Sequence, residues 1–123
     1  MTERSVSKLN VYFEEQIAMC RQRSNTLLAD ERADEAVFEK VKANVYGIFQ
    51  TILSAAGNAR GGDHEAVRQF FLEKAESIQE NWRTAYEKAE KHEDPVRMQI
   101  ERIKMDTIRE IKASFLRIVG ETP

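Results

Sequence analysis

Three side chains in this sequence are of types that often carry chemistry: Cys20, His64 and His92. A thiolate can act as a nucleophile, and an imidazole can transfer a proton or bind a metal. Neither histidine has a Glu three positions before it, the spacing used in di-metal bundles, and one straight helix would hold the two about 42 Å apart. Cys20 falls in helical phase with Phe13 and Ile17, which is typical of a small buried residue. We therefore assign no catalytic residue, no metal site and no cofactor.

Binding sites for phosphate or nucleic acid are equally poorly supported. The glycine-rich loop 57–63 leads into a helix start, where backbone amides attract anions, but Asp63 at that position would repel a phosphate. The basic side chains of the last segment are interleaved with Glu101, Asp106 and Glu110, and the net charge is −2. This pattern is typical of a solvated helix surface, so we expect no nucleic-acid partner.

The length and composition of the chain predict one domain spanning residues 1–123. Apolar residues make up 41 % of the 123 residues, which is enough for one core. Cys20 is the only cysteine and excludes an intramolecular disulfide. The first residues are polar and lead into no apolar segment of the kind that a secretory signal needs, and no apolar run approaches the roughly 20 residues of a membrane helix. We expect a cytoplasmic protein with no membrane partner.

The elements that must position these side chains are all helical. The segment from Asp94 to Gly120 begins with Asp-Pro, which suits an N-cap followed by a first helical residue, and closes on a glycine. Apolar residues recur on one helical face in four segments, and no segment alternates with a period of two. The predicted fold is all-α, an up-and-down antiparallel bundle of four, possibly five, helices over about 5–29, 34–56, 63–92 and 95–119. The predicted core positions, none of them Asp, Glu or His, include Leu9, Phe13, Leu27, Leu28, Val37, Phe38, Ile48, Phe49, Val67, Phe71, Ile100, Ile103, Phe115 and Val96.

The predicted boundaries leave two questions open. Gly57 is expected to end one helix and Asp63 to cap the next. The segment 30–35 contains neither Gly nor Pro, so it is either a tight turn capped by Asp30 or Asp34, or part of one helix about 75 Å long. Its charged residues at core positions favour the turn. In the third segment, Ser77 fits a capping box and would divide that segment into two helices.

The last segment is more apolar than a simple bundle helix requires. Besides its main face it carries a second stripe of Met98, Met105 and Leu116, and other segments add the off-face residues Tyr12, Met19, Tyr46 and Leu53. Either this helix is central and covered on several sides, or the stripe faces a partner, for which methionine is a frequent choice. We predict an interaction surface formed by Met98, Met105, Leu116, Tyr12 and Met19.

Trp82 is the only tryptophan, and it shares a helical face with Ala85 and Tyr86. The small alanine leaves room either for a large side chain from another helix or for an apolar ligand. Trp82, Ala85 and Tyr86 are therefore a candidate pocket.

Together these patterns predict a non-enzymatic protein-interaction or scaffold module that self-associates as a dimer or binds another protein. Two alternatives stay open: a bundle that binds a small apolar ligand or effector, and an enzyme whose site forms only in the folded assembly.

Overall fold

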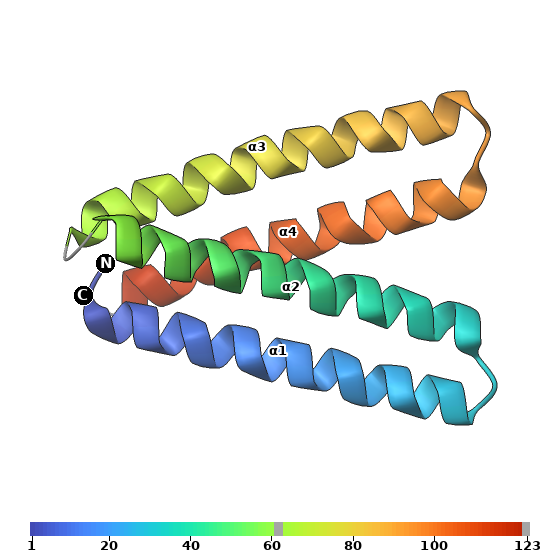
Figure 1. Cartoon of the computed structure of the whole chain (residues 1–123), viewed down its shortest axis with the longest axis horizontal. Helices are drawn as coiled ribbons and strands as arrows, with labels where there is room; N and C mark the ends of the chain where they lie inside the picture. The colour runs from blue at the N-terminus through green and yellow to red at the C-terminus, as the bar shows by residue number, and fades with distance from the viewer. Residues whose placement is uncertain (61–62, 122–123) are drawn as a thin grey trace.

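The computed structural model describes residues 1–60 and 63–121, and these form four α-helices without a strand. In chain order they are α1 (Glu3–Ala29), α2 (Ala33–Arg60), α3 (His64–Lys91) and α4 (Pro95–Glu121). Figure 1 shows two long antiparallel hairpins, α1 with α2 and α3 with α4, with the two chain ends at the same end of the molecule. The predicted all-helical, up-and-down bundle is confirmed.

Side-chain caps fix where three of the helices begin. The Asp63 carboxylate accepts a hydrogen bond from the Ala66 amide at 3.1 Å, and the Asp94 carboxylate accepts one from the Arg97 amide at 3.1 Å. Both are the predicted N-caps. α1 begins with a capping box, in which the Ser5 amide donates to the Thr2 hydroxyl at 3.2 Å and the Ser5 side chain bonds back to the Thr2 amide. Each cap satisfies amides that have no partner inside the helix.

The two hairpin turns share one backbone motif. At the first, Glu31 adopts a left-handed φ of 60°, and the Arg32 amide donates to the Leu27 carbonyl at 2.8 Å. At the second, Glu93 has a φ of 52°, and the Asp94 amide donates to the Ala89 carbonyl at 3.0 Å. These are Schellman motifs, which end a helix by pairing its last carbonyls. The chain therefore turns at 30–32, and residues 33–35 already belong to α2. Of the two expected caps, Asp30 is the C-cap of α1, and Asp34 lies inside the first turn of α2.

Two expected helix ends are wrong. α2 continues past Gly57 to Arg60, and α4 continues past Gly120 to Glu121. Glycine permits a left-handed helix end but does not impose one, and both glycines stand inside a continued helix. Ser77 also lies inside an unbroken α3, so it starts no fifth helix. The rest of the glycine-rich loop, residues 61–62, lies outside the described residues.

The core is centred on Phe71 of α3, which contacts one phenylalanine from every other helix. Its ring centroid lies 6.4 Å from that of Phe13 on α1, 5.6 Å from Phe49 on α2 and 4.2 Å from Phe115 on α4. All four rings are fully buried. Aromatic burial of this size dominates the packing energy of a small domain. We call the end of the bundle that holds this cluster and the chain ends the closed end.

At the opposite end, which holds both hairpin turns, the hairpins separate (Figure 1). Here predicted core residues are exposed: Leu28, Val37 and Val96 retain 45, 46 and 67 % of their accessible surface. We call this the open end. The expectation that Leu28, Val37 and Val96 are core residues is wrong. A helical wheel predicts the same buried face along the whole length of a helix, and it contains no information on whether two hairpins diverge.

The buried face of α2 also differs from the predicted one. Tyr46 and Leu53, placed off-face from the sequence, are 3 and 1 % exposed, whereas Ile48 is 40 % exposed. Phe49 is buried as predicted, and Val45 and Leu53 lie with it in the core. Contacts from both α3 and α4 widen the face that α2 must bury.

A third difference concerns Glu101, a charged residue that is fully buried in a core expected to lack carboxylates. Its Oε1 receives ion pairs from Arg97 at 2.9 Å and from Lys104 at 3.2 Å, one helical turn to either side. The hydrogen bond from its neighbour Arg102 to the Tyr86 hydroxyl shows that this part of α4 lies beside α3. A buried charge is tolerated when it is paired, and these two cations provide that pairing.

Candidate functional site

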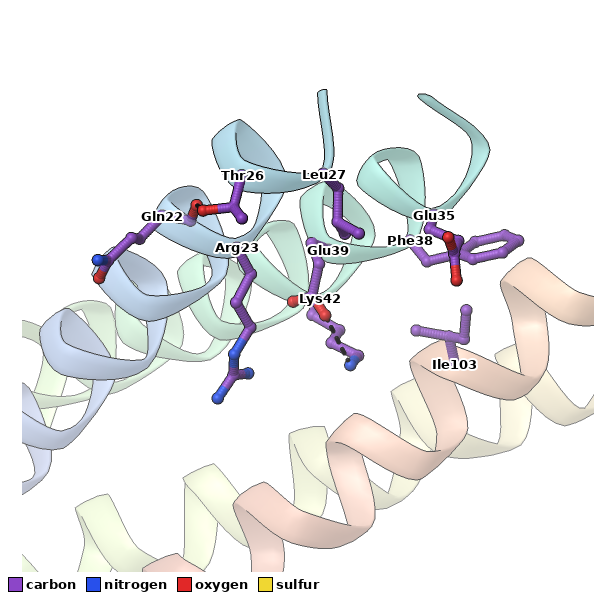
Figure 2. A pocket seen from close by; sticks show the side chains of 9 residues that line it. All are labelled: Gln22, Arg23, Thr26, Leu27, Glu35, Phe38, Glu39, Lys42 and Ile103. Atoms are coloured by element: carbon purple, nitrogen blue, oxygen red, sulfur yellow. Dashed lines mark hydrogen bonds and ion pairs between the residues drawn. The ribbon is translucent and has the colours of Figure 1, made fainter. Parts of the chain in front are cut away.

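A hollow lies at the open end, between the α1–α2 hairpin and α4. It has a volume of about 610 Å³, and α1, α2 and Ile103 of α4 line it (Figure 2). A second hollow of about 430 Å³ adjoins it through Phe38 and reaches Val96 and Ile100 on α4. We call these two hollows together the cleft.

The cleft has an apolar side. Leu27, Phe38 and Ile103 are half-buried around the first hollow, and Val37 and Val96 are exposed around the second. Figure 2 shows Ile103 projecting from α4 toward the Phe38 side of the hollow. Because these residues continue the apolar periodicity of the core, their exposure marks a face that the chain alone leaves uncovered.

The cleft also carries charges, most of which are neutralised within the chain. Glu39 pairs with Lys42 at 3.2 Å, and Glu35 pairs with Arg32. Arg23 extends from α1 toward α4 (Figure 2), and it has no ion-pair partner within residues 1–60 and 63–121. The same holds for Asp34 in the first turn of α2, which lines the second hollow. One cation and one carboxylate of the cleft thus lack an ionic partner among the described residues.

Cys20 lies behind the cleft, in a further hollow of about 620 Å³ between α1, α2 and α4 that also includes Met19. Burial and the negative charge of Glu39 raise the pKa of the Cys20 thiol to about 11. A thiol with this pKa is almost entirely protonated at neutral pH, so Cys20 is a poor nucleophile. As the sequence predicts, it packs as a buried residue.

The same hollow contains a polar contact between helices that the sequence analysis did not identify. The Tyr46 hydroxyl of α2 donates a hydrogen bond to the Glu110 carboxylate of α4. Burial and this acceptor raise the pKa of Tyr46, so the phenol stays protonated. The contact holds α2 to α4.

The candidate pocket residues contact α4. Lys104 Nζ lies 5.6 Å from the centroid of the Trp82 ring, and Arg102 donates to the Tyr86 hydroxyl at 2.8 Å. Trp82, Ala85 and Tyr86 are all half-buried. Tyr86 and Trp82 therefore face charged side chains of α4, which make cation–π contacts with their rings.

The residues of the predicted interaction surface lie in different environments. Met98 and Met105 are half-buried, while Leu116 is 48 % exposed. Tyr12 is half-buried and packs edge-on against Tyr46, with ring centroids 6.1 Å apart. Met19 is 41 % exposed and borders the hollow that adjoins the cleft.

The two histidines lie at opposite ends of α3, His64 as its first residue and His92 as its C-cap. Among the described residues, no group of three or more His, Cys, Asp or Glu side chains is placed to hold a metal ion. Across that same part of the chain, no helix has both the length and the apolar character to cross a membrane.

Comparison with known proteins adds no assignment: the chain matches no family model, no curated protein and no solved structure.

Proposed function

We propose that this protein is a non-enzymatic interaction module that self-associates as a dimer through its open end. The observation that carries the proposal is the uncovered apolar face of the cleft, where Val37 and Val96 retain 46 and 67 % of their accessible surface. Contiguous apolar patches on monomeric proteins are limited in size, and the largest is often a binding surface.

The architecture supports the same conclusion. The aromatic cluster around Phe71 joins all four helices at the closed end, so the hairpins can diverge at the open end without loss of the fold. Cys20, the one candidate nucleophile, is held protonated by burial and by Glu39. A stable fold with an apolar cleft and an inert thiol suits binding better than catalysis.

Sedimentation equilibrium at about 1 to 100 µM tests the proposal, because a dimer with micromolar affinity dissociates within that range. We expect a dimer. Phe38→Glu and Ile103→Glu should shift it to monomer with an unchanged helical circular-dichroism spectrum. A wild-type monomer at every concentration would refute self-association.

Leu116→Glu provides the matched comparison, because Leu116 is exposed on α4 but does not line the cleft. It should leave the dimer intact. If Leu116→Glu dissociates the dimer and Phe38→Glu does not, the protein self-associates through the stripe of Met98, Met105 and Leu116 instead.

A second candidate function is binding of a small amphipathic anion. The volume of the first hollow, about 610 Å³, lies in the range of ligand pockets, and Arg23 lines it together with the apolar Leu27 and Phe38. Titration with decanoate tests it. Because Ile103 lines this hollow and its neighbour Lys104 contacts Trp82, binding should change the tryptophan fluorescence, and Arg23→Gln should abolish that change.

A further inference from the structure

We propose that the occupant of the cleft is a second copy of this chain, docked about a two-fold axis that passes near Phe38, with Arg23 of each copy paired to Asp34 of the other. This rests on the proposed self-association and adds to it the surface, the symmetry and the charge pairing.

Arg23 and Asp34 differ from the other charged residues of the cleft, which form ion pairs within the chain. Glu35 and Glu39 are already paired within the chain, to Arg32 and Lys42. Arg23 and Asp34 have no ion-pair partner in the part of the chain that the structure describes. A partner that closes the cleft must leave these two charges in water or meet each with its opposite, because burying an unpaired charge is costly.

The positions of the two charges fit a two-fold axis. Arg23 lines the first hollow, Asp34 lines the second, and Phe38 lines both. The cation and the carboxylate thus lie on either side of Phe38. A two-fold axis brings a surface patch against itself with its two sides exchanged. An axis near Phe38 therefore sets Arg23 of one copy against Asp34 of the other, twice, without bringing like charges together.

The apolar residues of the cleft have the composition of an interface centre. Phe38 would lie near the axis against its own copy, and an aromatic residue at the centre of a patch is the usual energetic anchor. Leu27 and Ile103 flank it in the first hollow, and Val37 and Ile100 flank it in the second. A second copy covers both hollows together, whereas a small ligand in the first hollow leaves Val37 and Val96 exposed.

Charge reversal with mixing tests the pairing. Alone, Arg23→Glu places two carboxylates against each other at each contact, and Asp34→Arg places two guanidinium groups together. We expect each variant to weaken the dimer at least about 10-fold. Mixed in equal amounts they should form a heterodimer of near wild-type affinity, because both contacts then join opposite charges. The double variant should also recover to within about 3-fold.

Arg21→Glu is the matched control, since Arg21 lies on the same helix but outside the cleft, and it should leave the dimer unchanged. A second measurement places the axis. In a Cys20→Ser background, Phe38→Cys should oxidise rapidly to a disulfide-linked dimer, and Val11→Cys, exposed on α1, should not.

The outcomes separate the two proposals. A wild-type dimer that is insensitive to both charge reversals, or variants that fail to recover when mixed, would overturn docking through the cleft and leave self-association standing. A wild-type monomer would overturn both. Binding of decanoate to a monomer, lost in Arg23→Gln, would make the occupant a small anion and would overturn the second copy.

Discussion

Phe71 of α3 stacks on Phe115 of α4 with ring centroids 4.2 Å apart and planes only 10° from parallel. Because Phe71 also contacts Phe13 and Phe49, this one ring joins both hairpins. The closed end is thereby fixed by a few large side chains, and the open end is left free to present its apolar face.

The first prediction concerns this cluster. Phe71→Ala should lower the free energy of unfolding by about 3–5 kcal/mol, because it removes a fully buried ring and leaves a cavity among three others. Urea denaturation measures the loss. Phe70→Ala is the control, since Phe70 is its half-buried neighbour on the same helix and should cost clearly less. Equal losses for the two variants would show that Phe71 is not the centre of the core.

The second prediction concerns the hairpin turns. Glu31 and Glu93 hold left-handed φ angles of 60° and 52°, a conformation that strains a residue with a Cβ. Glu31→Gly and Glu93→Gly should each stabilise the fold by about 1 kcal/mol, because glycine is the usual residue at this position of a Schellman motif. Thermal and urea unfolding provide the measurement.

The control for the turn variants is Glu14→Gly, at an exposed position inside α1, where glycine should destabilise by about 1 kcal/mol. A loss of stability at Glu31 and Glu93 as well would mean that their carboxylates contribute more than the backbone strain costs.

Sequence patterns predict the elements of this fold because the signals are local. Asp63 and Asp94 are N-caps in the structure as in the prediction, since a cap depends only on the next three residues. The helix ends predicted at Gly57 and Gly120 are wrong, because glycine at a helix end is a preference rather than a constraint. The turn at 30–32 lacks the usual sequence signal, because the residue with a left-handed backbone is Glu31 instead of a glycine. Only the charged residues of this segment indicate a turn.

The cleft could be predicted only in part. Leu27, Phe38 and Ile103 were assigned to the core, because their periodicity matches that of residues that are buried. The position of the closed end depends on how the two hairpins cross. The sequence of a single helix does not contain that information. Arg23 has no distinguishing sequence signal, and the signal at Asp34 indicates only a turn. Their importance appears only once the other charges of the cleft are seen to be paired.

The third prediction concerns the buried carboxylate of Glu101, whose Oε1 pairs with Arg97 and Lys104 and whose Oε2 has no hydrogen-bond partner among the described residues. Replacing both cations, Arg97→Met with Lys104→Met, should destabilise the protein by about 3 kcal/mol, because a buried charge is left uncompensated. Urea denaturation gives the value.

Adding Glu101→Gln to that double variant should recover most of the loss, since the buried group is then neutral. This recovery separates a charge effect from lost packing of the two long side chains. If the triple variant is no more stable than the double, Arg97 and Lys104 act through their hydrocarbon stems rather than by neutralising Glu101.

The last prediction is a pH dependence that follows from the Cys20 thiol. Its pKa is raised from 9.0 to about 11 by burial and by Glu39, so the folded protein keeps this proton at pH values where the unfolded chain loses it. The stability that this proton contributes is therefore complete below pH 9 and falls as the pH rises toward 11.

At pH 8, the native thiol should react with a disulfide reagent about 100-fold more slowly than the thiol of the unfolded chain, since each pKa unit changes the thiolate fraction tenfold. Glu39→Gln should speed the native reaction, whereas Glu14→Gln, remote on the exposed face of α1, should not. A native rate equal to the unfolded rate would show that Cys20 is accessible and ionisable, and would reopen the question of thiol chemistry beside the cleft.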